Sequence, residues 1–223
     1  MVRAETNTRK KVQSEKPLAA SPSHFPIRPL QDQADTFYVS GHGNHSTGQV
    51  LGGELSPDAV QPYWGQDIDK VIIAGCSVLD INDYNNFFVG PRPGGGNWAS
   101  SDHTASPGET WATVGPKLLM GYNAMAPLDD NVGDPNFTKD IITNYLNSTE
   151  TDDVKRWMYA NRDKAIAADP NRKNGLGVSN PNGRPWNACV IDMRGDGAYW
   201  YWDVSSPDAQ GYPTLKMVPR SEW

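Results

Sequence analysis

KVIIAGC, residues 70–76, is a nearly continuous apolar run that ends in glycine and cysteine. A strand that is apolar on both faces belongs in the middle of a covered parallel sheet. A second run, TFYVS at residues 36–40, is rich in β-branched and aromatic residues and leads into Gly41-His42-Gly43. This composition predicts another strand that runs into a glycine turn.

A short helix is expected between these two strands. Ser56 has the character of an N-cap residue and Pro57 suits the first helical position, so we predict a helix over residues 57–63. Strand, helix and strand form a βαβ unit in which both strands point the same way. His42 and Cys76 then fall at the carboxyl ends of the two strands, where open parallel sheets bind ligands.

The rest of the chain predicts one α/β domain over residues 35–223, preceded by a proline-broken leader over 1–34 that is disordered or extended. Its sheet is expected to be mostly parallel and to end in an antiparallel hairpin. A long Gly-, Asn- and Pro-rich loop over 83–108 interrupts it. The further elements expected are helices at 109–114, 135–146 and 151–169, and strands at 117–122, 188–193 and 198–202.

The charge balance and the cysteine count exclude several classes of protein. The chain has 223 residues, and its 20 basic and 26 acidic side chains give a net charge of −6. This argues against nucleic acid or an anionic membrane as the main partner, since both need a basic face. No stretch predicts a membrane span or a secretory signal. Two cysteines are too few for a disulfide framework, although a single Cys76–Cys189 bridge stays open.

His42 and Cys76 are the residues that could carry chemistry. A cysteine nucleophile needs a nearby base and backbone N–H groups that hold the developing oxyanion. Adjacent parallel strands lie about 4.8 Å apart, so side chains at their ends can approach each other. The N–H groups of Gly43 and Cys76 could both face a substrate carbonyl. Glycine at positions 41 and 75 lowers the steric cost of the sharp turns.

These two strand ends resemble the paired signature of the caspase-like cysteine peptidases, which include caspases, metacaspases, clostripain, gingipain, legumain, separase and the CHAT proteases. In that family one apolar strand ends in His-Gly and a later one ends in Ala-Cys or Gly-Cys. The ending Gly75-Cys76-Ser77 is most similar to the separase and CHAT branch. The resemblance covers roughly residues 35–147 and includes GPKLLMG at residues 115–121, which is similar to the strand after the cysteine.

The resemblance implies a three-layer α/β/α sandwich and hydrolysis of protein or peptide substrates through a thioester, without a cofactor or a metal. Cys76 would be the nucleophile, His42 the acid and base, and Gly43 an oxyanion donor together with Cys76. Relatives that cut after Arg or Lys line the pocket with carboxylates. The candidates for that role are Asp129 and Asp130, which we favour, and then Asp80 and Asp83. Trp98 and Trp111 would either line a substrate groove or pack the glycine loop.

The sequence departs from the family in front of His42. Relatives have two strands before the His-bearing strand, whereas this chain has the proline-broken leader. Those sheet positions could be empty, filled by the C-terminal hairpin, or supplied by a longer parent chain from which an effector or toxin module is released.

Two alternatives to catalysis by Cys76 and His42 stay open at this point. Cys76 could be an inert buried cysteine, and the domain could then be an inactive binding module. Zinc could be held by His42 and His45 with Cys76 or His103, which would make a zinc-dependent hydrolase. Cys189 lies in the middle of an expected strand and is expected to belong to the core.

Overall fold

The computed structural model describes residues 36–44, 48–51, 55–64, 68–81, 107–127, 135–168, 185–203 and 205–222. Within these ranges the elements follow one another in the order β1 (Thr36–Ser40), α2 (Pro57–Trp64), β2 (Lys70–Ala74), α4 (Pro107–Trp111), β3 (Leu118–Tyr122), α6 (Phe137–Asn147), α7 (Asp153–Ala168), β4 (Ala188–Asp192), β5 (Ala198–Asp203), β6 (Thr214–Pro219) and the 3₁₀ helix η4 (Arg220–Glu222). The expected leader and the loop over residues 83–108 fall almost entirely outside the described residues.

The strands form one six-stranded mixed sheet in the order β1-β2-β3-β4-β5-β6. β1 pairs with β2 and β2 with β3 in parallel, which confirms the predicted βαβ unit. From β3 onward every pairing is antiparallel. The predicted α/β class and the β4–β5 hairpin are therefore confirmed, but a mostly parallel sheet is wrong for the second half. A single connecting helix brings the chain back to the end of the sheet at which the previous strand began, so the next strand is parallel. Between β3 and β4 the chain forms two helices, α6 and α7, and it therefore enters β4 from the opposite end.

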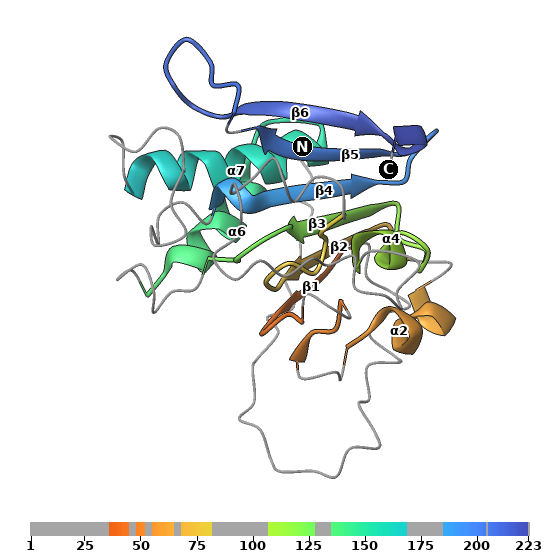
Figure 1. The fold of residues 1–223 in the computed structure, drawn as a ribbon. Coiled ribbons are helices and arrows are strands. Elements are labelled where there is room, and N and C mark those ends of the chain that lie inside the picture. The colour runs from red at the N-terminus through yellow and green to blue at the C-terminus, as the bar shows by residue number, and fades with distance from the viewer. Residues whose placement is uncertain are drawn as a thin grey trace, which may run out of the picture.

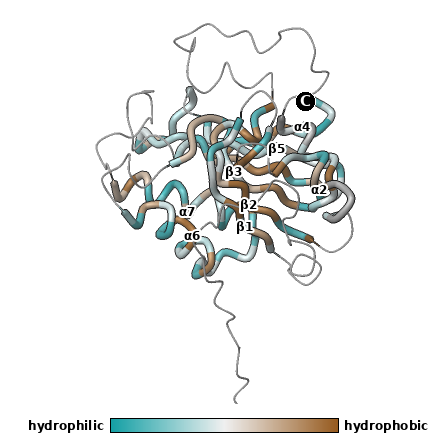
Figure 2. The backbone as a smooth tube through the Cα atoms, turned by 90° about the horizontal axis from the view of Figure 1, so that it is seen from below, coloured by the Kyte–Doolittle hydropathy of each residue, from teal (hydrophilic) through white to brown (hydrophobic). Residues whose placement is uncertain are grey.

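Helices cover both faces of the sheet (Figure 1). α2 and α4 contribute to a core cluster with Val71, Ile73 and Leu119, and α6 and α7 contribute to a second cluster with Ile72 and Met120. This split follows the alternation of side chains along each strand. All five residues of β3 are buried, and so are four of the five in β2. Figure 2 shows these central strands as the hydrophobic middle of the molecule.

Polar side chains cap the starts of α2 and α7, whereas the Asn136 side chain makes no cap hydrogen bond at α6. Ser56 Oγ accepts the Ala59 N–H at 3.3 Å, so the predicted N-cap of α2 is confirmed. α6 begins at Phe137, with Asn136 at its N-cap position, and not at residue 135. α7 begins at Asp153 because Asp152 Oδ1 accepts the Val154 N–H at 2.9 Å. The sequence places this start at Thr151, two residues too early.

The two edges of the described sheet are β1 and β6. β6 is not among the strands expected from the sequence. It pairs with β5 along its full length. The C-terminal hairpin extends the sheet on the side of β4, so it does not fill positions beside β1. Within the described ranges, no helix is long and apolar enough to cross a membrane.

Candidate active site at the ends of β1 and β2

The parallel pairing of β1 and β2 brings the chain segments that carry His42 and Cys76 to the same edge of the sheet. Ser40 is opposite Ala74 in the parallel ladder, and the Gly41 N–H donates to the Ala74 carbonyl at 3.3 Å. His42 and Cys76 each lie two residues beyond this last pair, and Gly43 packs on the Cys76 backbone. The strands are therefore neighbours that point the same way, as the sequence predicts.

Glycine at positions 43 and 75 lets the two strand ends touch. A β-carbon at Gly43 would meet the Cys76 carbonyl oxygen, and it would stand 2.8 Å from the Cys76 nitrogen. A β-carbon at Gly75 would stand 3.3 Å from the Gly41 carbonyl oxygen and 3.4 Å from the Gly43 Cα. Ordinary contacts of a β-carbon are longer, so the segment around Gly43 packs on the Cys76 backbone at a distance that only glycine permits.

The thiol of Cys76 is free and half-buried, on the face of the sheet covered by α6 and α7. Its Sγ accepts the Ala126 N–H at 3.4 Å, which ties the sulfur to the segment after β3. His42, just after β1, is exposed. The thiol is therefore anchored against the core, whereas the imidazole is open to solvent.

A strained turn follows the cysteine directly. Ser77 has a φ of +55° although it is not glycine, and its N–H donates to the Ala124 carbonyl at 2.7 Å. Left-handed backbone costs a non-glycine residue about 1–3 kcal/mol and persists where the surroundings enforce it. The turn ends β2 abruptly and leaves Cys76 at the rim of the sheet.

The two predicted oxyanion donors are the backbone N–H groups of Gly43 and Cys76. Gly43 forms an isolated antiparallel bridge with Val50, in which the Asn44 N–H donates to the Gln49 carbonyl and the His42 carbonyl accepts from Leu51. Neither the Gly43 N–H nor the Cys76 N–H donates to a backbone carbonyl of the described residues. Both lie where the two strand ends meet.

The second cysteine is inert by its surroundings. Cys189 is fully buried in the α2 and α4 core and is also a free thiol, so the Cys76–Cys189 bridge is excluded. Burial raises the pKa of the Cys189 thiol far above its ordinary value of 9.0, and Asp80 adds to the shift. Its prediction as a core residue is confirmed.

Two of the expected substrate-binding residues lie in the core. Trp111 is 0% exposed, and its indole N–H donates to the Gly48 carbonyl at 2.8 Å, so its expected place in a groove is wrong. Its ring packs on Trp64 because this part of the chain closes the α2 side of the core. Asp80 is 6% exposed, and its charge helps to raise the pKa values of Cys189 and Tyr199. Both of these residues belong to the core cluster on the α2 and α4 face of the sheet, so Asp80 lies on that face.

Other predicted site residues fall outside the described residues, namely Asp129, Asp130, Asp83, Trp98, His45 and His103. Within the described ranges no three His, Cys, Asp or Glu side chains gather as a metal site would require.

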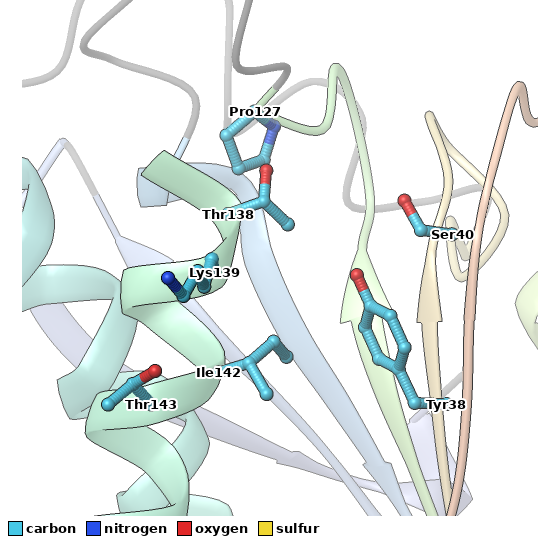
Figure 3. Close-up of a pocket in the computed structure, with 7 residues that line it drawn as sticks. All are labelled: Tyr38, Ser40, Pro127, Thr138, Lys139, Ile142 and Thr143. Carbon is cyan, nitrogen blue, oxygen red and sulfur yellow. The ribbon is translucent and has the colours of Figure 1, made fainter. Parts of the chain in front are cut away.

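The structure adds a groove that the sequence analysis missed. We call it the β1–α6 groove. It has a volume of about 420 Å³ and is lined by Tyr38, Ser40, Pro127, Thr138, Lys139, Ile142 and Thr143. Figure 3 shows Tyr38 and Ser40 on the β1 side and the residues of α6 across from them. The segment after β3 is the signal that could have predicted this groove. β3 is parallel to β1 and β2, so its carboxyl end lies at the same edge of the sheet as theirs.

Comparison with known proteins found no family model, no curated protein and no solved structure that matches the chain.

Proposed function

We propose that this chain is a caspase-like cysteine endopeptidase in which Cys76 is the nucleophile and His42 the acid and base. The observation that carries the proposal is the parallel pairing of β1 and β2, which brings the chain segments with His42 and Cys76 to the same edge of the sheet. The close packing of Gly43 on Cys76 adds to it. Helices on both faces of the sheet fit the three-layer arrangement of that family.

In the proposed reaction His42 takes the proton of Cys76, and the sulfur attacks the carbonyl carbon of the scissile peptide bond. The N–H groups of Gly43 and Cys76 hold the oxyanion of the tetrahedral intermediate. The C–N bond then breaks, and the leaving amine takes the proton from His42. A thioester remains on Cys76. Water attacks it while His42 accepts the proton of the water, and the carboxylic product leaves as the thiol reforms.

The departure from the family at β1 bears on this proposal. β1 is the edge of the described sheet, where the relatives named above carry two further strands. An inactive binding module with the same fold is the alternative that this departure favours. A preference for a basic residue before the cut remains a prediction, because Asp129 and Asp130 lie outside the described residues.

Cleavage of a peptide library by matched cysteine variants tests the proposal. We expect Cys76→Ala to abolish cleavage and Cys189→Ala to retain it, because only Cys76 is at the strand ends. Iodoacetamide should inactivate the wild type, and a chelator should leave it active. Activity that survives alkylation but is lost with the chelator would establish the zinc alternative. A folded wild type that cleaves no peptide in the library would favour the binding module.

A further inference from the structure

We propose that the β1–α6 groove binds an acidic side chain of the peptide substrate and that Lys139 is the residue that selects it. This inference rests on the proposed function and adds a substrate preference to the same site. It concerns a subsite on the β1 side of the catalytic pair, separate from the position predicted to take a basic residue.

Two of the residues that line the groove are close along the chain to residues of the candidate active site. Ser40, which lines the groove, lies two residues before His42 on the same chain segment. Pro127, on the opposite wall, directly follows Ala126, whose N–H donates to the Cys76 sulfur at 3.4 Å. A peptide whose scissile bond lies at Cys76 therefore has the groove within reach of its neighbouring side chains. The volume of about 420 Å³ falls within the range of ligand pockets, about 300–1,000 Å³.

The charge of the groove comes from one side chain. Lys139 is exposed and is the only charged residue among the seven that line the groove. None of the ion pairs between described residues involves Lys139, whereas its helix neighbour Asp140 pairs with Lys164. The other polar lining groups are the hydroxyls of Tyr38, Ser40, Thr138 and Thr143. A carboxylate is the substrate group that fits this ammonium, since it carries the opposite charge and accepts the hydrogen bonds that the ammonium donates.

The edge position of β1 gives the substrate backbone a place to lie. β2 pairs with one side of β1, and no described strand pairs with the other. An extended peptide can add to such an edge through main-chain hydrogen bonds, while its alternate side chains enter pockets on one face. Tyr38 and Ser40 point toward α6 on that face and Ile142 points back toward them (Figure 3), so a substrate side chain beside them would lie against the α6 wall, which also carries Lys139.

Binding to an inactive variant tests the inference without using catalysis. The protein is the full chain with Cys76→Ala, and the probes are fluorescein-labelled hexapeptide pools in which one position at a time is fixed as Glu or as its neutral isostere Gln. We expect one position at which Glu binds roughly two- to fivefold more tightly than Gln, the range of a solvent-exposed ion pair. This preference should shrink as ionic strength rises. Lys139→Arg should keep it and Lys139→Glu should abolish or reverse it.

Lys216→Glu is the matched control, because Lys216 is an exposed lysine on β6 at the opposite edge of the sheet. It should leave the preference unchanged. Equal binding of Glu and Gln pools, absence of binding, or a preference that Lys139→Glu leaves intact would overturn the inference. Cleavage by the wild type is measured in parallel: a Lys139-dependent preference without any cleavage defeats the proposed function alone, and cleavage without the preference defeats this inference alone.

Discussion

A β-carbon at Gly43 would stand 2.8 Å from the backbone nitrogen of Cys76, closer than real β-carbons approach such an atom. The two residues are 33 positions apart in the sequence, yet their backbones are in direct contact. This contact joins the segment after β1 to the segment after β2.

Gly43→Ala should therefore destabilise the protein and disturb the site. The added methyl group meets the backbone of Cys76, which cannot move without displacing β2, and overpacking of this kind costs about 1–3 kcal/mol. Urea denaturation measures the change in the free energy of unfolding. Gly41→Ala is the control, because its methyl group meets the end of the Leu51 side chain, which is 38% exposed and can turn away. Equal losses in the two variants would contradict the backbone contact.

Asp153→Asn should lower stability by about 1.5–3 kcal/mol at pH 7, the range of hydrogen bonds to charged groups. The Asp153 carboxylate, 12% exposed, bonds Lys70 of β2 at 2.8 Å and Arg156 of its own helix at 3.1 Å, and so ties α7 to the sheet. Burial raises the pKa of Asp153, but Lys70 and Arg156 outweigh it and hold the pKa below the ordinary 3.8.

A pKa that is lower in the folded state means that this stabilisation is present above about pH 4 and is lost as the pH falls through the folded value. The difference in unfolding free energy between wild type and Asp153→Asn should therefore vanish in acid. Asp69→Asn is the comparison: Asp69 pairs with Lys117 at 2.6 Å but both side chains are about half exposed or more, and no measurable change is expected. A larger effect at Asp69 than at Asp153 would refute this assignment.

Alkaline pH should weaken the fold through Cys189. Burial raises the pKa of this thiol, so above pH 9 the unfolded chain loses a proton that the folded chain keeps, and stability falls as pH rises. One such group contributes about 1.4 kcal/mol per pH unit. Cys189→Ala should reduce the slope of unfolding free energy against pH between 9 and 10 by about that amount. The same slope in both proteins would show that Cys189 is not buried. The buried phenols of Tyr122 and Tyr199, whose pKa values burial also raises, add to the slope only above pH 10.

The first half of the fold could be predicted from the sequence because its signals are local. Residues 36–40 and 70–74 are short apolar runs, each ended by glycine, and Ser56-Pro57 begins a helix between them. β6 has no such signal: Pro219 ends it, and two of its residues are exposed because it lies at the sheet edge. The antiparallel direction of β4 follows from the two helices between β3 and β4, and the residues of the strand itself do not indicate it.

The candidate site divides in the same way. His42 and Cys76 could be found because carboxyl ends of neighbouring parallel strands always meet at one edge of a sheet. Ala126 and Lys139 could not, because their place near the sulfur and the groove follows from how the chain turns after β3 and from the packing of α6. The sequence could not decide whether Trp111 lies in a groove or in the core, because its packing on Trp64 is a contact between distant parts of the chain.

The rate at which iodoacetamide alkylates Cys76 in the folded protein at pH 7 tests the pairing with His42 most directly. The measurement is made in a Cys189→Ala background, so that a single thiol reports. We predict that His42→Ala slows the reaction at least tenfold, because the imidazole no longer takes the thiol proton, and that His45→Ala leaves it unchanged. Equal rates with and without the His42 imidazole would contradict the proposed catalytic pair.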